Sequence, residues 1–271
     1  MPVKNILSVY SGEDARVAGL DHAIRIARHH EGWITGCVIH GHSVLEQRFA
    51  TLLSEHVLSN LREVDENRIS AIKSRFEERT ALAGVSAEFI ECSSDETLSV
   101  AARNFDLIVM GRHHAELDED HLSAHPEYVA VHSGRPILVV PDGYTADSLA
   151  DHAVVAWDGK RAAARALGDA LPFLADKAKV TVLTIGKSKP DLDDPASPLR
   201  LLARHRINAV HHHVQRDGNS IGQTIMTAAD DVGAKLIVMG AFEHSRLGQS
   251  IVGGATTDVL RNAAVPVFLS H

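Results

Sequence analysis

One pentapeptide, Leu-Ile-Val-Met-Gly, occurs twice in this chain, at residues 107–111 and again at residues 236–240. Each copy is followed by a second apolar segment that begins with proline, at residues 136–140 and 266–270. An internal repeat of this kind indicates that one folding unit occurs twice. A continuous apolar run that ends in glycine is typical of a strand buried on both faces of a parallel sheet. The glycine allows a tight turn at the carboxyl end of the strand, where open α/β sheets bind ligands. The repeat therefore predicts two copies of one small α/β domain.

Length and composition agree with two soluble domains. The chain has 271 residues, of which 45% are hydrophobic and 23% charged, so each half can bury a core of its own. No run approaches the roughly 20 apolar residues of a membrane span, and the amino terminus lacks a signal-peptide pattern. The net charge of -8, with no block of Lys and Arg, disfavours binding to nucleic acid or anionic membranes. We therefore expect a cytoplasmic protein that binds neither nucleic acid nor membrane.

The only two cysteines, Cys37 and Cys92, fall on predicted strands of the first half that could be neighbours. Buried free thiols in a reducing cytosol are the simpler interpretation, and a redox pair is the alternative.

The order of predicted elements is the same in both halves. The first domain, residues 1–142, has predicted strands at residues 3–10, 33–40, 85–92, 107–111 and 136–140. A long helix at residues 44–82 carries apolar residues at helical spacing, namely Leu45, Phe49, Leu52, Val57, Leu61, Val64, Ile72 and Phe76. A linker containing Gly143 leads to the second domain, residues 151–271. That domain has predicted strands at residues 152–157, 180–185, 208–214, 236–240 and 266–270, and helices at residues 161–174, 199–205, 221–232 and 255–261.

A candidate ligand site follows the repeated strand of the second half. Residues 240–257 form a loop that enters a helix through the pair Gly253-Gly254 and two threonines. Free backbone N–H groups and the positive end of the helix dipole make such a helix start a site for anions, phosphate above all. Arg246 could add positive charge, and Ser250 or Thr256 a hydroxyl donor. The alternative is that the glycine pair only permits close packing of helix against strand, with Thr256 near an N-cap.

Over nearly its whole length the chain resembles a tandem universal stress protein. That family has a signature of Gly, two residues, Gly, nine residues, Gly and then Ser or Thr, placed after a strand that ends in Met-Gly. The signature binds the phosphates of ATP in the members that have it. Here Gly240 and Gly253 match, whereas Glu243 stands at the second Gly and Gly254 at the Ser/Thr position. The resemblance implies an α/β fold of two tandem five-stranded, parallel-sheet domains of the adenine nucleotide alpha-hydrolase-like, Rossmann type. They would pack as a pseudo-dimer through the strands near residues 136–140 and 266–270.

The resemblance also implies an adenine-nucleotide site for ATP or ADP, with Mg²⁺ as a candidate companion. Asp158 ends the first strand of the second half, where the family places an acidic residue near the ribose and base. Ile185 falls where the family meets adenine through its backbone. The full set of implied binding residues is Asp158, Ile185, Met239, Gly240, Arg246, Gly253, Gly254, Ala255 and Thr256.

Two features qualify the nucleotide interpretation. A carboxylate at Glu243 repels a passing phosphate unless Arg246 or a metal ion neutralises it. Asp158 precedes a helix that starts near Lys160, so an ordinary N-cap is an equally good explanation of its position.

The first half departs further from the signature. After Gly111 comes a loop with four acidic residues, which repel phosphate, and Ala124-His125-Pro126 stands where a glycine pair would open the next helix. Tyr10-Ser11 replaces the expected acidic residue on the first strand. We therefore expect that this half has lost the nucleotide site and serves as a packing partner.

The same loop also suggests metal binding. His113, His114, His121 and His125 supply imidazoles beside carboxylates, and His121 and His125 are spaced to share one face of a helix. Among the 18 histidines of the chain, further groups occur at residues 29–30 and 211–213, and at most two of the latter can share a face of a strand. A solvated polar loop is the preferred interpretation, because no rigid ligand frame is evident.

No enzyme is predicted. The chain has no Gly-x-x-x-x-Gly-Lys-Ser/Thr loop, no Gly-x-Ser-x-Gly elbow and no His-Glu-x-x-His motif. The sequence thus predicts a cytoplasmic stress-response protein whose adenine nucleotide is a signal or structural ligand, with at most slow, incidental ATP hydrolysis. The first alternative is a nucleotide-free interaction module that acts through a protein partner. The second is a metal-binding protein that uses the first-half histidines. Further association of two chains into a homodimer is left open.

Overall fold

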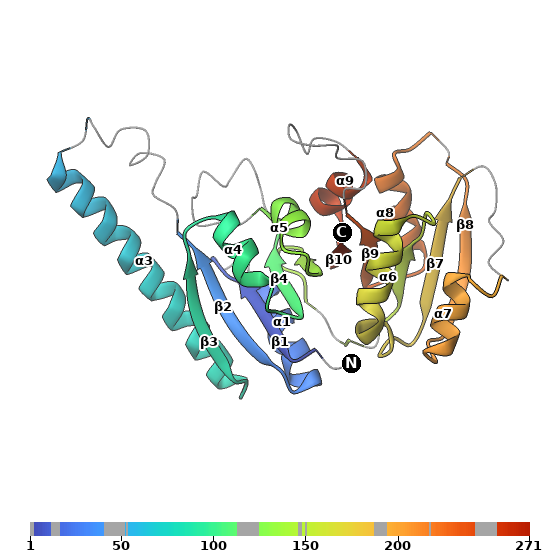
Figure 1. The fold of residues 1–271 in the computed structure, drawn as a ribbon, viewed down its shortest axis with the longest axis horizontal. Helices are drawn as coiled ribbons and strands as arrows, with labels where there is room; N and C mark the ends of the chain where they lie inside the picture. The colour runs from blue at the N-terminus through green and yellow to red at the C-terminus, as the bar shows by residue number, and fades with distance from the viewer. Residues whose placement is uncertain are drawn as a thin grey trace.

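The structure is a computed structural model that describes residues 3–11, 17–40, 52, 54–112, 125–145, 148–149, 151–186, 194–216, 218–241 and 254–271. Strands and helices alternate along both halves (Figure 1). The first half contains β1 (Asn5–Val9), α1 (Val17–His30), β2 (Trp33–Ile39), α3 (Glu55–Leu82), β3 (Ala87–Cys92), α4 (Asp95–Ala102), β4 (Leu107–Gly111), α5 (Pro126–His132) and β5 (Ile137–Val140). The second half contains β6 (Ala153–Ala156), α6 (Arg161–Leu174), β7 (Val180–Ile185), α7 (Pro198–Arg204), β8 (Ala209–Val214), α8 (Ile221–Asp231), β9 (Leu236–Gly240), α9 (Ala255–Asn262) and β10 (Val267–Ser270).

All ten strands join in one sheet, in the order β3-β2-β1-β4-β5-β10-β9-β6-β7-β8. Within each half the strands are parallel, whereas β5 and β10 pair antiparallel, with Val139 opposite Val267 and Leu138 opposite Phe268. Both halves therefore have the same internal strand order, and the two last strands join them edge to edge. The prediction that these strands form the mutual interface is confirmed.

The repeated strands are buried on both faces, as their continuous apolar sequence predicts. Leu107 and Val109 join one hydrophobic cluster, and the alternate residues Ile108 and Met110 join the other. The first cluster includes apolar residues of α1 and α6, and the second includes those of α4, α5, α8 and α9. Because each cluster contains residues of both halves, the two units share their core across the central strand pair.

Helix α3 differs from its prediction. Its described part begins at Glu55, with the Ser54 hydroxyl accepting from the Val57 N–H, and the expected segment at residues 44–51 lies outside the described residues. Its buried residues all lie from Ile69 onward, so the expected apolar contact of the earlier turns is wrong for Val57, which is 41% exposed, and Val64, which is 63% exposed. Figure 1 shows why: the amino-terminal part of this helix extends beyond the sheet, where no described element covers it.

Two smaller findings complete the fold. Cys37 and Cys92 are free, buried thiols on the neighbouring strands β2 and β3, as the simpler interpretation predicts, and their side chains lie within hydrogen-bonding reach of each other, as the redox-pair alternative requires. No helix among the described residues combines the length and apolar composition needed for a bilayer crossing.

Candidate functional site

Three neighbouring strands of the second half have their carboxyl ends side by side, at the carboxyl edge of the sheet. Strand β6 pairs with β9 on one side and with β7 on the other, and all three are parallel. Helix α6, which follows β6, packs in one hydrophobic cluster, whereas α9, which follows β9, packs in the other. The chain thus leaves β6 and β9 toward opposite faces of the sheet, which is the arrangement that opens a ligand crevice in α/β folds. This topology brings Asp158, Ile185 and Gly240 to the same edge.

The start of α9 lies at that edge and requires glycine. Gly254 is the N-cap of the helix, with φ 143° and ψ 170°, a conformation that is essentially restricted to glycine. A Cβ added there would meet no atom of the described residues within 4 Å, so the packing interpretation has no support at Gly254 from the part of the chain that the structure describes. Because the first turn of a helix leaves its N–H groups without helical acceptors, Ala255 and Thr256 begin α9 with donors suited to an anion.

Gly240 has the opposite explanation. A Cβ on this residue would lie 2.5 Å from the carbonyl carbon of Ala162 and 2.6 Å from the nitrogen of Ala163, both in the backbone of α6. Glycine at the end of β9 is thus what permits α6 to lie against the strand. The neighbouring Met239 side chain is 4% exposed and belongs to the hydrophobic core, so only its backbone is available to a ligand at this edge.

Asp158 lies in the turn between β6 and α6. Its Oδ1 accepts a hydrogen bond from the Lys160 N–H at 3.0 Å, and its Oδ2 lies 3.8 Å from the Lys160 Nζ. Lys160 itself is the N-cap of α6, without a side-chain cap, so the prediction that Asp158 could be an N-cap is wrong. The carboxylate stabilises the turn and is 55% exposed, which leaves it accessible to a ligand.

Ile185 is the last residue of β7 and is partly buried against the second hydrophobic cluster. Glu243, Arg246, Ser250 and Gly253 lie outside the described residues, so their roles stay predictions.

The corresponding edge of the first half is built differently. Arg112, directly after β4, donates from its guanidinium to the Ala263 carbonyl at the end of α9 in the other half. Burial lowers the pKa of Arg112, and the nearby Asp142 carboxylate opposes that shift. One residue past its repeated strand, the first half thus directs a side chain across the interface.

The helix start of the first half is occupied by a carboxylate. His125 is the N-cap of α5, and Asp95 accepts from its backbone N–H at 3.1 Å and contacts its ring Nδ1 at 2.5 Å. His125 therefore lies before α5, and the prediction that it shares a helix face with His121 is wrong for this residue. His113, His114 and His121 lie outside the described residues.

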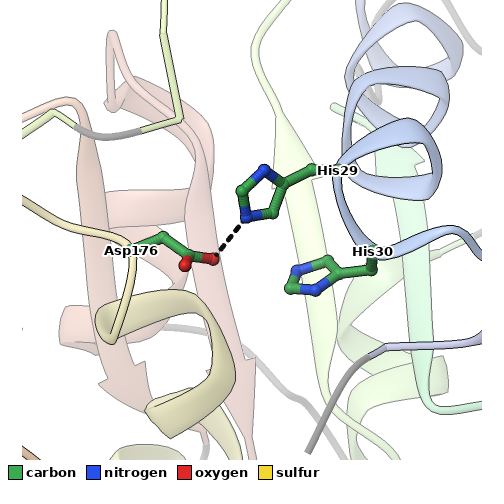
Figure 2. A group of neighbouring side chains, drawn as sticks. All are labelled: His29, His30 and Asp176. Carbon is green, nitrogen blue, oxygen red and sulfur yellow. Dashed lines mark hydrogen bonds and ion pairs between the residues drawn. The ribbon is translucent and has the colours of Figure 1, made fainter.

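Two other histidine groups can be placed. His211 and His213 both contact the Thr184 hydroxyl, at 2.8 and 3.0 Å, which confirms that two residues of this run share one face of β8. Within the described residues, His29 and His30 meet Asp176 in a group whose potential metal-ligating atoms all lie within 4.8 Å of one another (Figure 2). The sequence marks the histidine pair but gives no sign of Asp176, which is 147 residues from His29.

Comparisons with known proteins agree with this architecture. The model of the universal stress protein family matches twice, at residues 2–141 and 150–271. A curated universal stress protein of Synechocystis sp. (strain PCC 6803) is 26% identical over 175 residues, which is 61% of this chain and 58% of the relative. A solved universal stress protein of Archaeoglobus fulgidus DSM 4304 is 18% identical, with 98% of this chain and 96% of that chain covered and a TM-score of 0.77. A solved Pseudomonas aeruginosa PAO1 protein of unknown function is 14% identical, with 99% and 92% covered and a TM-score of 0.56. At these identities the two structures show the fold alone.

Proposed function

This chain belongs to the universal stress protein family, and from that premise we propose that its second half binds an adenine nucleotide, ATP or ADP, as a signal or structural ligand. The start of α9 carries the proposal. Gly254 holds a conformation that no described neighbour requires by packing, at the edge where β6, β7 and β9 end. The first-turn N–H groups and the positive end of the helix dipole suit a phosphate at this point.

The rest of the nucleotide would lie along the same edge. The exposed carboxylate of Asp158 is suited to accept hydrogen bonds from ribose hydroxyls, and the backbone at Ile185 to meet the adenine. Glu243 repels a bare phosphate, so a nucleotide that carries Mg²⁺ fits this loop better than a free one. Any hydrolysis would be slow and incidental.

In this proposal the two domains, residues 1–142 and 151–271, have different roles. The Arg112 guanidinium binds a carbonyl at the end of α9, and a cation there complements the negative end of the helix dipole. The first half would thereby support the helix that presents the ligand site. Its own helix start would stay silent, because Pro126 at the first helical position has no N–H and the Asp95 carboxylate lies at the helix start, where it accepts from the backbone N–H of His125.

The proposal is tested by isothermal titration of the EDTA-treated protein with ATP and ADP, with and without MgCl₂. We expect one site per chain, with tighter binding in Mg²⁺. Gly254→Val should abolish binding, because valine cannot take up the observed conformation without strain. The matched control is His125→Val, the N-cap of the corresponding helix, whose φ of -93° valine accepts, and this variant should bind as the wild type does.

Two sites per chain would overturn the assignment of a silent first half. A folded protein that binds neither nucleotide at millimolar concentration would overturn the proposal itself.

A second function, a nucleotide-free interaction module, is favoured by one observation. The first four turns of α3, from Glu55 to Arg68, have no buried residue, although Val57 and Val64 are among their exposed apolar side chains. A helix that extends from the body in this way offers a surface for a protein partner. Absence of nucleotide binding, together with saturable binding of a partner that Val64→Glu abolishes, would support this function instead.

A further inference from the structure

The last two residues of α1 face a carboxylate of the other half. His29 and His30 end α1, and Asp176 lies two residues beyond the end of α6 (Figure 2). The His29 Nε2 and the Asp176 Oδ2 are 2.9 Å apart, and one nitrogen of His30 completes a set of three atoms that lie within 4.8 Å of one another. Both helices end beside the amino ends of the strands, on the side of the sheet opposite the carboxyl edge that is proposed for the nucleotide.

The spacing is close to that of a metal site. Two ligands of a tetrahedral zinc ion, each about 2.0–2.1 Å from the metal, lie about 3.3 Å apart. The His29–Asp176 pair would have to open slightly, and the widest pair would have to close by at most roughly 1.5 Å. Side-chain rotation can supply both changes, because the His29 and Asp176 side chains are 45% and 34% exposed.

The backbone beneath these ligands is fixed. The Lys4 Nζ donates to the carbonyls of His30 and Glu31, at 2.7 and 3.0 Å, and the Gly32 N–H bonds to Ala27, so the end of α1 is tied to the start of β1. The ring of Phe173 meets His30 edge-on, with centroids 6.0 Å apart. Contacts of this kind orient a metal-ligating side chain before the metal binds. The sequence around the loop histidines of the first half gives no sign of such contacts.

A plain ion pair does not account for the whole group. The His29–Asp176 contact alone would be a partly exposed pair of the kind that contributes little to stability. It does not involve the adjacent ring of His30, whose ring contacts are edge-on packing against His29 and Phe173.

We propose that His29, His30 and Asp176 bind one divalent transition-metal ion and that this ion links the two halves of the chain. Two imidazoles and one carboxylate suit Zn²⁺, with water in the remaining position, better than they suit Mg²⁺ or Ca²⁺. Because α1 supplies two ligands and the segment after α6 the third, binding holds the halves together at the edge opposite the proposed nucleotide site.

The test is zinc titration of the EDTA-treated full-length chain by calorimetry, with Co²⁺ absorption as a second readout. We expect one strong site per chain. His30→Ala and Asp176→Asn should each weaken zinc binding at least about tenfold, since loss of a direct ligand costs at least as much as loss of an outer partner. Zinc should also raise the melting temperature of the wild type but not of His30→Ala.

Two controls separate this site from other histidines. His56→Ala removes an exposed histidine of α3, and the triple variant His113→Ala/His114→Ala/His121→Ala removes the loop imidazoles. Both should bind zinc within about twofold of the wild type. Binding that is lost in the loop variant but kept in His30→Ala would overturn the proposal, as would a folded wild type that does not bind zinc saturably. Neither result depends on whether the chain binds a nucleotide.

Discussion

His22 makes the stability of the junction between the halves sensitive to acid. It lies on α1 and lines a small cavity between the halves together with Tyr144 and Lys177. Burial lowers the pKa of His22 to about 4, and the charges of Lys177 and Arg25 act in the same direction. The folded protein therefore holds this imidazole neutral at a pH at which an unfolded chain would protonate it.

The sign and size of the effect follow from linkage. Between pH 6.5 and about 4 the unfolded chain binds more protons at this position than the folded chain, so stability falls as the pH falls through that window. The difference between the two pKa values of His22, at about 1.4 kcal/mol per pH unit, limits the loss of unfolding free energy to about 3 kcal/mol. The ring keeps some contact with solvent, so we expect a loss of about 1–2 kcal/mol between pH 7.5 and pH 5.0.

Urea unfolding of the wild type and of His22→Gln, each at pH 7.5 and pH 5.0, measures this contribution. Other groups titrate equally in both proteins, so the difference between the two losses isolates His22. His56→Gln, at an exposed position of α3, controls for the removal of an imidazole as such. If the wild type and His22→Gln lose the same free energy of unfolding between the two pH values, the argument that the fold keeps His22 neutral is refuted.

Three further predictions concern packing and the link between the halves. Gly240→Ala should lower the free energy of unfolding by about 1–3 kcal/mol, because the added Cβ meets backbone atoms of Ala162 that cannot turn away. Urea unfolding measures this loss, and an unchanged midpoint would contradict the close approach of α6. Arg112→Leu should lower the free energy of unfolding by about 1.5–3 kcal/mol, since it removes a charged donor from the Ala263 carbonyl. Thermal unfolding at high and low salt should detect this loss. A melting temperature equal to that of the wild type would show that the contact contributes nothing. Phe76→Ala should lower the free energy of unfolding by about 3–5 kcal/mol, because this ring is fully buried. Nucleotide binding by this variant should persist at low temperature. A loss of stability smaller than that of Ile→Val substitutions would contradict the burial.

The parts of the fold that the sequence predicted best are those whose environment is uniform. Strands β4 and β9 are buried on both faces, so the continuous apolar runs mark them from residue to residue. Helix α3 shows the limit of the same reasoning. Apolar periodicity indicates which face of a helix would contact a neighbour, but not whether a neighbour buries it, and Val57 and Val64 stay 41% and 63% exposed.

The candidate site shows a second limit, because one residue type occurs there for two unrelated reasons. Gly240 is required by the backbone of α6 beside it, whereas Gly254 is required by its own dihedral angles, since no described atom lies within 4 Å of a Cβ added there. A sequence contains neither the neighbours nor the angles, so it could not separate packing from a ligand loop. Asp176 was missed for a related reason: its meeting with His29 depends on the antiparallel pairing of β5 with β10, which sets the two halves side by side.

The two halves share a strand order but differ at corresponding points, and the differences form a consistent pattern. At the helix that follows the repeated strand, the second half has Gly254, whose dihedral angles favour glycine, and the first half has His125 against Asp95. One residue past the repeated strand, the second half has buried Ala241, and the first half has Arg112, which reaches the end of α9. The Asp95 carboxylate accepts from the backbone N–H of His125, and Arg112 extends a contact across the interface, so neither difference adds to an anion site in the first half. A duplicated unit in which the first copy supports the second therefore explains the residues at these points in both halves. It also predicts that substitution of Arg112 weakens ligand binding at a site that Arg112 does not contact.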